Sequence, residues 1–203
     1  MNNLVLAFPL YNYLKFCNES HNEKTILDCG AGGSNPPLSL FYEHGYKTYG
    51  IEICKKQLEK ANVFCKEQNM DLNIIWGDML KIPFPNSFFG FLFSYNTSVH
   101  IKKNDFMIAL SEFHRVLKDD GLCYVNFLSE NCDSCGEGKE ISDGEYVTIQ
   151  NNEEVLYVHY KDTEIESLLS KFEIIYKEER TVKRKQNAKY ISSGFYEYIL
   201  KKK

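Results

Sequence analysis

The stretch Thr25-Ile26-Leu27-Asp28-Cys29-Gly30-Ala31-Gly32-Gly33-Ser34 decides the fold, because it joins a short apolar run to a glycine-rich turn. Such a run is typical of a buried strand, and glycines after it let a ligand approach the backbone. The last glycine of a dinucleotide-binding Gly-x-Gly-x-x-Gly turn is missing, since Asn35 stands there. Asp28 would repel a pyrophosphate but attract a cationic amine. The turn therefore indicates a nucleotide-like ligand that carries an amino group.

Short apolar runs alternate with helical patterns from residue 25 to residue 121, which is typical of a parallel sheet with crossover helices. The expected strands are 25–29, 48–53, 72–76, 88–94 and 122–128. For the first crossover helix, Asn35 predicts the N-cap, Pro36 the first helical position and Gly45 the end. An apolar stripe of Phe106, Ala109, Leu110, Phe113 and Leu117 predicts the helix before the fifth strand.

The regular alternation stops after residue 128. Residues 129–145 are rich in Ser, Asp, Gly and Glu and predict a loop. Residues 146–150 and 155–160 then predict a hairpin that turns at Asn151-Asn152. A helix at 163–170 and strands at 172–178 and 195–201 complete the expected order, and we predict one domain over residues 1–203 with a helical segment at 1–24.

Composition limits the class of protein. A chain of 203 residues with 43% hydrophobic content can bury one sizeable core. The net charge of -4 argues against a nucleic-acid partner, although Lys183-Arg184-Lys185 and Lys201-Lys202-Lys203 form basic clusters. Seven cysteines, an odd number scattered through apolar segments, favour a reducing cytoplasm over a disulfide framework. The apolar run 4–10 contains Pro9 and follows no basic residue, so we expect neither a signal peptide nor a membrane span.

The pair Cys132 and Cys135 has the spacing of half a zinc site. A second pair at suitable spacing is absent from the sequence, and structural zinc needs four ligands. We therefore predict no metal.

Three carboxylates follow three successive predicted strands: Asp28, Glu52 and Asp78. The carboxyl ends of parallel strands line the crevice where open sheets bind ligands. A carboxylate can accept hydrogen bonds from an amino group, from two ribose hydroxyls or from an exocyclic amine of adenine. The three together describe a ligand with an amino acid end, a ribose and an adenine.

These residues resemble the class I S-adenosylmethionine-dependent methyltransferases in four motifs, and the resemblance covers almost the whole chain from Thr25 to the C-terminus. The motifs are residues 27–34, with Ser34 in place of a glycine, Gly50-Ile51-Glu52-Ile53, Gly77-Asp78-Met79 with Ile82-Pro83-Phe84, and Arg115-Val116-Leu117-Lys118-Asp119-Asp120-Gly121. The family usually has Pro-Gly-Gly in the last motif and Asp where Gly90 stands, and we interpret both departures as structural. The resemblance implies a Rossmann-like α/β fold with a seven-stranded, mostly parallel sheet, helices on both faces and an antiparallel last strand. It also implies a small hairpin insertion after the fifth strand, at residues 129–160, near the active site.

The resemblance implies S-adenosylmethionine as methyl donor, with S-adenosylhomocysteine as product. Gly30, Ala31 and Gly32 would present backbone to the methionine portion, close to Asp28. Glu52 with Ile53 would hold the ribose, Asp78 with Met79 the adenine, and Ser94 with Tyr95 would face the sulfonium.

The acceptor is less constrained. Asn35-Pro36-Pro37 has the composition of the clamp used by nitrogen methylases, but that clamp follows the fourth strand, where this chain reads Ser94-Tyr95-Asn96-Thr97. His100 and Tyr95 are the candidate catalytic residues and His159 a candidate substrate contact, against structural roles in loop bonding or packing.

We predict an enzyme that methylates a small molecule. A noncatalytic S-adenosylmethionine-binding module or partner subunit is the second hypothesis. A tRNA or protein methyltransferase is the third, suggested by the short N-terminal segment and the basic clusters. The sequence leaves the oligomeric state open.

Overall fold

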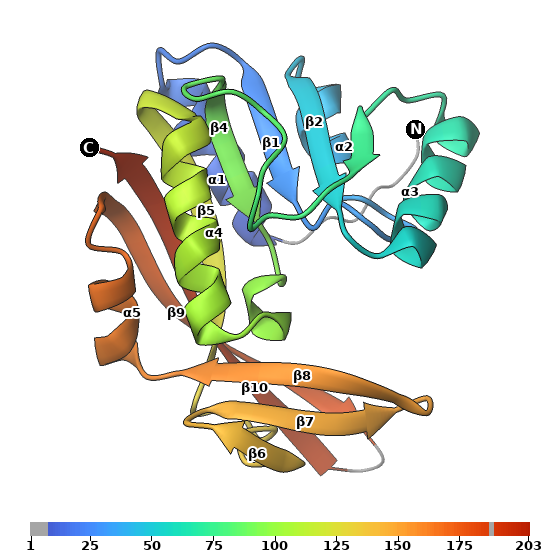
Figure 1. Ribbon diagram of the computed structural model, residues 1–203, viewed down its shortest axis with the longest axis vertical. Helices are drawn as coiled ribbons and strands as arrows, with labels where there is room; N and C mark the ends of the chain where they lie inside the picture. The colour runs from blue at the N-terminus through green and yellow to red at the C-terminus, as the bar shows by residue number, and fades with distance from the viewer. Residues whose placement is uncertain (1–7, 187–188) are drawn as a thin grey trace.

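The computed structural model describes residues 8–186 and 189–203 of the chain (Figure 1). Seven strands form the main sheet in the order β3-β2-β1-β4-β5-β10-β9. They are β1 (Thr25–Cys29), β2 (Lys47–Glu52), β3 (Ile74–Trp76), β4 (Phe89–Ser94), β5 (Leu117–Ser129), β9 (Phe172–Gln186) and β10 (Lys189–Lys202). The first five pair in parallel, and β10 runs antiparallel between β5 and β9. The predicted Rossmann-like α/β fold is confirmed.

Helices cover both faces of this sheet. Apolar side chains of α1 (Phe8–Glu19), α2 (Leu38–Glu43) and α3 (Lys55–Gln68) pack on one face. Those of α4 (Lys103–Val116) and α5 (Asp162–Leu168) pack on the other, with α4 in front of the sheet in Figure 1. The predicted apolar stripe of α4 is buried from Phe106 to Phe113. The helix ends at Val116, and Leu117, the last residue of the predicted stripe, belongs to β5.

The first crossover helix begins later than predicted. Asn35 is not its N-cap, and α2 starts at Leu38, after Pro37. A proline disfavours helical backbone at the residue before it, so the regular helix starts only after both prolines. The end is as expected, with Gly45 at a positive φ of 78° directly after the helix.

The last two strands are longer than predicted. β9 and β10 continue as a hairpin to Gln186 and Lys189, because each pairs with the other along its length. Their lysine- and glutamate-rich sequence lacks the apolar alternation that marks a half-buried strand. The third strand is shorter than predicted and the fifth begins at Leu117.

The insertion is a three-stranded sheet at the carboxyl end of β5. It contains β6 (Lys139–Ser142), β7 (Glu145–Gln150) and β8 (Glu153–Tyr160). The predicted turn at Asn151-Asn152 is confirmed, with φ of 51° and 63°. β6 was missed because its side chains are exposed and its sequence is polar. Leu128 of β5 pairs in parallel with His159 of β8, which fixes the insertion to the main sheet.

The predicted N-terminal helical segment, residues 1–24, contains α1, and residues 1–7 lie outside the described residues. Within residues 8–186 and 189–203, the helices all fall short of the length and apolarity needed to cross a membrane. All seven cysteines are free thiols.

Both departures from the family pattern have a local cause. A Cβ atom at position 90 would lie 2.2 Å from the Glu23 carbonyl oxygen, so the side chain found in the family cannot fit against this loop. Asp120 has a left-handed φ of 59° at a position where the family has glycine, and its side chain pairs with Lys201.

Candidate functional site

A cavity of about 480 Å³ lies where β1, β2, β3 and β4 end at the carboxyl edge of the sheet. The turns after these four strands line it. The lining residues are Gly30, Ile51, Glu52, Ile53, Cys54, Gly77, Asp78, Met79, Leu80, Asn96, Thr97, His100 and Ile101. Six predicted site residues are among them: Gly30, Glu52, Ile53, Asp78, Met79 and His100.

The glycine turn lies directly against the turn after β4. The amides of Gly30 and Ala31 donate to the Ile51 carbonyl at 2.9 and 3.1 Å, which binds this turn to β2. Gly30 has a φ of +102°, and a Cβ atom there would lie 2.3 Å from Thr97 Oγ1. Only glycine fits this conformation and this approach. Ala31 is fully buried, so it offers the cavity no side-chain surface.

Glu52 joins the turns after β1 and β2. Its Oε2 accepts the Gly32 amide at 3.0 Å, and its Oε1 accepts the Cys54 amide at 2.7 Å. Each carboxylate oxygen accepts more than one hydrogen bond, so both retain capacity for ribose hydroxyls. The sequence did not predict that this side chain also builds the turn it faces.

Asp28 is buried beside this turn and is 2% exposed. Its Oδ2 atom has no hydrogen-bond partner among the described residues. Burial, and then the nearby charge of Glu52, raises the pKa of the Asp28 carboxyl well above its usual range. A ligand cation would supply the missing partner, so this orphaned oxygen and the Gly30 turn fit the amino acid end of S-adenosylmethionine.

We expect Asp28→Asn to raise the free energy of unfolding at neutral pH. The unfolded chain releases the Asp28 proton above a pH of about 4, whereas the folded chain keeps it up to the raised pKa. Wild-type stability therefore falls as the pH rises through this window, and the variant lacks this loss. The difference should grow by about 1.4 kcal/mol per pH unit in that window. Urea unfolding at several pH values measures it.

The matched control is Asp119→Asn, whose side chain is 92% exposed. It should follow the wild-type pH dependence. A stability difference for Asp28→Asn that stays constant with pH would contradict the assignment.

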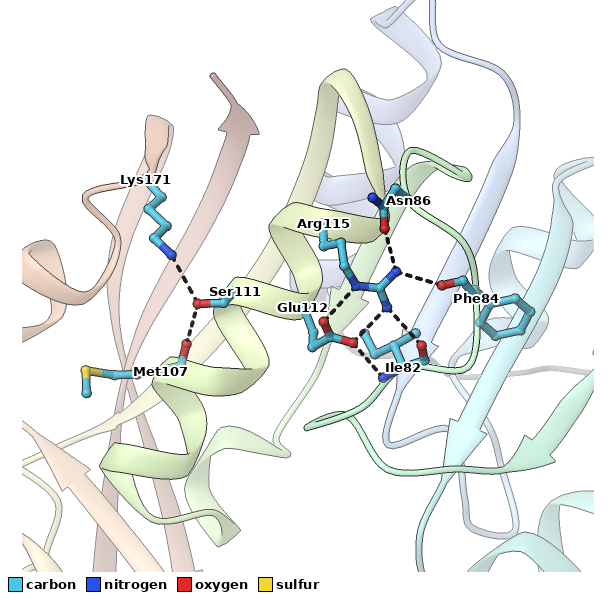
Figure 2. Close-up of polar contacts among 8 residues, drawn as sticks. All are labelled: Ile82, Phe84, Asn86, Met107, Ser111, Glu112, Arg115 and Lys171. Atoms are coloured by element: carbon cyan, nitrogen blue, oxygen red, sulfur yellow. Dashed lines mark hydrogen bonds and ion pairs between the residues drawn. The ribbon is translucent and has the colours of Figure 1, made fainter.

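The turn after β3 carries Asp78, whose Oδ1 accepts the Leu80 amide at 2.9 Å. The chain that follows is pinned to α4 by Arg115, as Figure 2 shows. The guanidinium donates to the carbonyls of Ile82 and Phe84 at 2.9 and 2.8 Å and to Asn86 Oδ1 at 3.0 Å. It also makes a bidentate pair with Glu112, at 2.7 Å for each bond.

Glu112 completes this arrangement, because its Oε2 accepts the Ile82 amide at 2.8 Å. Its hydrogen bond with Arg115 lowers the pKa of the Glu112 carboxyl. The two α4 side chains therefore fix the backbone of the third motif, which begins at the cavity.

We expect Arg115→Lys to lower the free energy of unfolding by about 1 to 3 kcal/mol, because a lysine cannot reproduce the planar fork and leaves carbonyl groups unpaired. S-adenosylhomocysteine affinity should fall with it, since the Asp78 turn loses its support. Denaturant unfolding and calorimetry measure the two effects.

Lys171→Met is the control, because Lys171 is exposed and its one hydrogen bond to the described residues goes to Ser111 Oγ of α4, the helix that carries Arg115 (Figure 2). Stability within error of wild type for Arg115→Lys would show that the guanidinium network is dispensable.

The turn after β4 depends on a residue that the sequence analysis missed. Asn96, at a positive φ of 55°, donates its amide to Asn126 Oδ1 at 2.7 Å, and Asn126 Nδ2 donates back to Asn96 Oδ1 at 2.7 Å. Asn126 is fully buried within the apolar strand β5. A polar residue in such a run must find partners, and that signal could have identified it.

Ser94 and Tyr95 do not face the cavity, so this prediction is corrected. Ser94 is fully buried and donates its hydroxyl to the Cys29 carbonyl at 3.1 Å. Tyr95 is half-buried, and its ring lies 6.2 Å from that of Tyr124 on the sheet face that carries α1. Ser94 and Tyr95 therefore lie on opposite faces of the sheet, as neighbours in an extended chain do.

The two candidate histidines have different surroundings. His100 ends the short helix η1 (Ser98–His100) and lines the cavity. Its Nδ1 lies 2.8 Å from the Leu156 carbonyl of β8, so Nδ1 carries the hydrogen. Nε2 has no hydrogen-bond partner within residues 8–186 and 189–203, so it can accept a proton. His159 is 1% exposed, and its Nε2 contacts Ser134 Oγ at 3.1 Å, so the proposed substrate contact is corrected.

Cys132 and Cys135 lie outside the cavity lining. The Cys132 thiol is buried, accepts the Gly194 amide at 3.0 Å and lies 3.1 Å from the Gly194 carbonyl oxygen. Among the described residues, no three His, Cys, Asp or Glu side chains gather closely enough to hold a metal ion. The absence of zinc stays a prediction.

A family model for a methyltransferase domain matches residues 27–125, which include all the cavity-lining turns. The chain belongs to the class I S-adenosylmethionine-dependent methyltransferases. Among curated methyltransferases it is 27% identical over 99 residues to a sterol 24-C-methyltransferase of Gibberella zeae, covering 48% of this chain and 26% of that protein. It is 32% identical over 93 residues to a probable tocopherol O-methyltransferase of Oryza sativa subsp. japonica, covering 43% and 25%. The chain thus spans about a quarter of the length of these relatives.

Solved methyltransferase structures share the whole fold. An S-adenosylmethionine-dependent methyltransferase from Methanosarcina mazei superposes with a TM-score of 0.76 at 20% identity, covering 97% of this chain and 98% of that one. This likeness extends the fold assignment to the insertion and the terminal strands.

Proposed function

We propose that this methyltransferase chain transfers a methyl group from S-adenosylmethionine to a small-molecule acceptor. The observation that carries the proposal is the grouping of Glu52 and Asp78 in one cavity beside the buried, unpartnered Asp28 oxygen. The names of the sterol and tocopherol relatives support a small acceptor.

The residues divide the work between binding and proton transfer. When bound, S-adenosylmethionine supplies an activated methyl group on its sulfonium. Asp28 pairs with the amino end, Glu52 accepts from the ribose and Asp78 accepts from the adenine amine. The Asn96–Asn126 pair holds the turn after β4, which lines the cavity that would hold the donor. Alignment of donor and acceptor lowers the activation barrier of methyl transfer by roughly 7 to 11 kcal/mol.

His100 removes the proton from a hydroxyl acceptor. Its free Nε2 is a suitable base because Nδ1 is fixed by the Leu156 carbonyl. An acceptor that ionises by itself needs no such base.

Calorimetry with S-adenosylhomocysteine and NAD tests the donor site. We expect the first to bind and the second not to bind, because Asn35 replaces the last glycine of a dinucleotide-binding turn. Tight NAD binding without a response to S-adenosylhomocysteine would overturn the proposal.

Acceptor-dependent formation of S-adenosylhomocysteine from a metabolite extract tests catalysis. The labelled product, identified by mass after reaction with isotopically labelled donor, names the acceptor. Donor binding without any labelled product would favour the noncatalytic module, and label in tRNA or protein would redirect the acceptor class.

A further inference from the structure

The segment Cys132-Asp133-Ser134-Cys135 forms a tight turn in the loop between β5 and β6. The Cys135 amide donates to the Cys132 carbonyl at 3.0 Å, which closes the turn. Neither central residue, Asp133 or Ser134, has a positive φ, so the turn is of type I. Its backbone is that of a single helical turn, in which the first and fourth side chains lie on the same side.

This turn brings the two cysteines within the span of a disulfide. Its first and fourth Cα atoms lie within about 7 Å of each other, and a disulfide spans roughly 4.4 to 6.8 Å between Cα atoms. Both residues are free thiols in this structure. The backbone therefore already has a conformation in which Cys132 and Cys135 can be joined.

The two thiols differ in their access to solvent. Cys132 is 5% exposed, and its Sγ accepts the Gly194 amide at 3.0 Å. Cys135 is only half-buried. A reagent in solution therefore reaches Cys135 first. An accessible cysteine beside a second one that can displace the reagent is typical of a redox-sensitive pair.

We propose that Cys132 and Cys135 are a redox-modification site that forms a reversible disulfide by exchange with a small disulfide such as oxidised glutathione. The Cys135 thiolate attacks one sulfur of the small disulfide, releases one thiol and keeps the other half as a mixed disulfide. The Cys132 sulfur then attacks the Cys135 sulfur, and the second thiol leaves. The protein loses two protons and two electrons, which convert the small disulfide into two thiols.

The disulfide would change how this loop is fastened to β10 and β8. Oxidation removes the hydrogen of the Cys132 thiol, which lies 3.1 Å from the Gly194 carbonyl oxygen of β10, and turns the sulfur that accepts the Gly194 amide toward Cys135. Ser134, inside the same turn, contacts His159 Nε2 of β8 at 3.1 Å. The redox state of the pair therefore acts on the attachment of the insertion.

Peptide mass mapping of the reduced full chain after incubation with oxidised glutathione tests the site. We expect a disulfide between Cys132 and Cys135 in wild type, with no glutathione retained on either residue. Cys132→Ser should retain glutathione on Cys135, because no second thiol displaces it. Cys135→Ser should carry about tenfold less glutathione on Cys132, because that thiol is buried. Cys132→Ala replaces Cys132→Ser if the serine variant fails to fold.

Cys54 is the internal control, because it is exposed and has no cysteine three residues away on either side. It should retain glutathione in wild type. Wild-type protein that keeps glutathione on Cys135, or leaves both thiols free while Cys54 is modified, would overturn the proposal.

Hydrogen exchange measures the effect on the loop. The Gly194 amide should exchange about tenfold faster or more in the oxidised protein and recover when dithiothreitol reduces the disulfide. An unchanged exchange rate would contradict the predicted effect on β10. None of these measurements needs a methyl acceptor.

Discussion

Glu52→Ala is expected to weaken S-adenosylhomocysteine binding by about 2 to 4 kcal/mol, which is roughly thirty- to a thousand-fold. The substitution removes the acceptor for the ribose hydroxyls. It also leaves the amides of Gly32 and Cys54 without the oxygens they bind at 3.0 and 2.7 Å. The loss thus combines a direct contact with the shape of the glycine turn, and calorimetry measures their sum.

Glu59→Ala is the matched control, because this carboxylate lies on the exposed face of α3, outside the cavity lining. It should bind S-adenosylhomocysteine as wild type does. Glu52→Gln separates the ribose contact from the support of the glycine turn. Glutamine keeps one accepting oxygen where the carboxylate has two. Wild-type affinity in Glu52→Ala would show that the ligand is seated elsewhere.

His100→Ala is expected to slow turnover of a hydroxyl acceptor by about a hundred-fold or more, the usual size of a general-base effect. Donor affinity should stay within a few-fold, because the carboxylates that hold the donor are unchanged. Single-turnover kinetics with saturating donor measure the rate, and calorimetry measures the affinity.

His44→Ala is a control with the same local chemistry. His44 Nδ1 also lies 2.8 Å from a backbone carbonyl, that of Leu40, but His44 follows α2 and is not among the residues that line the cavity. Its loss should leave turnover unchanged. A wild-type rate in His100→Ala would remove the histidine from the proposed mechanism and favour an acceptor that ionises by itself.

The sequence predicted the sheet and the donor-side turns because these depend on local patterns. Apolar runs, a glycine turn and carboxylates at strand ends follow one another in the chain, so spacing is enough to find Gly30, Glu52 and Asp78. The late start of α2 shows the limit of this reasoning. Asn35 and Pro36 fit the rules for a helix start, but Pro37 disfavours helical backbone at Pro36, the residue before it.

The acceptor side was harder to predict because it is built by contacts between distant segments. Asn126 meets Asn96 across 30 residues, and Leu156 meets His100 across 56. Alternation along one strand could have placed Tyr95 opposite the cavity side. The buried pair of Glu197 with Arg180 depends on the register of β9 and β10, whose charged sequence concealed their length.

In the proposed mechanism, the hydrogen bond between His100 and the Leu156 carbonyl makes the insertion part of the proton transfer. An insertion of this kind is commonly regarded as an exchangeable segment that covers the active site and selects the substrate. Here the backbone of β8 decides which ring nitrogen carries the hydrogen. For the proposed mechanism to survive replacement of residues 129–160, the new segment must place a backbone carbonyl at the same position. Without that carbonyl, the acceptor would have to reach the site already deprotonated.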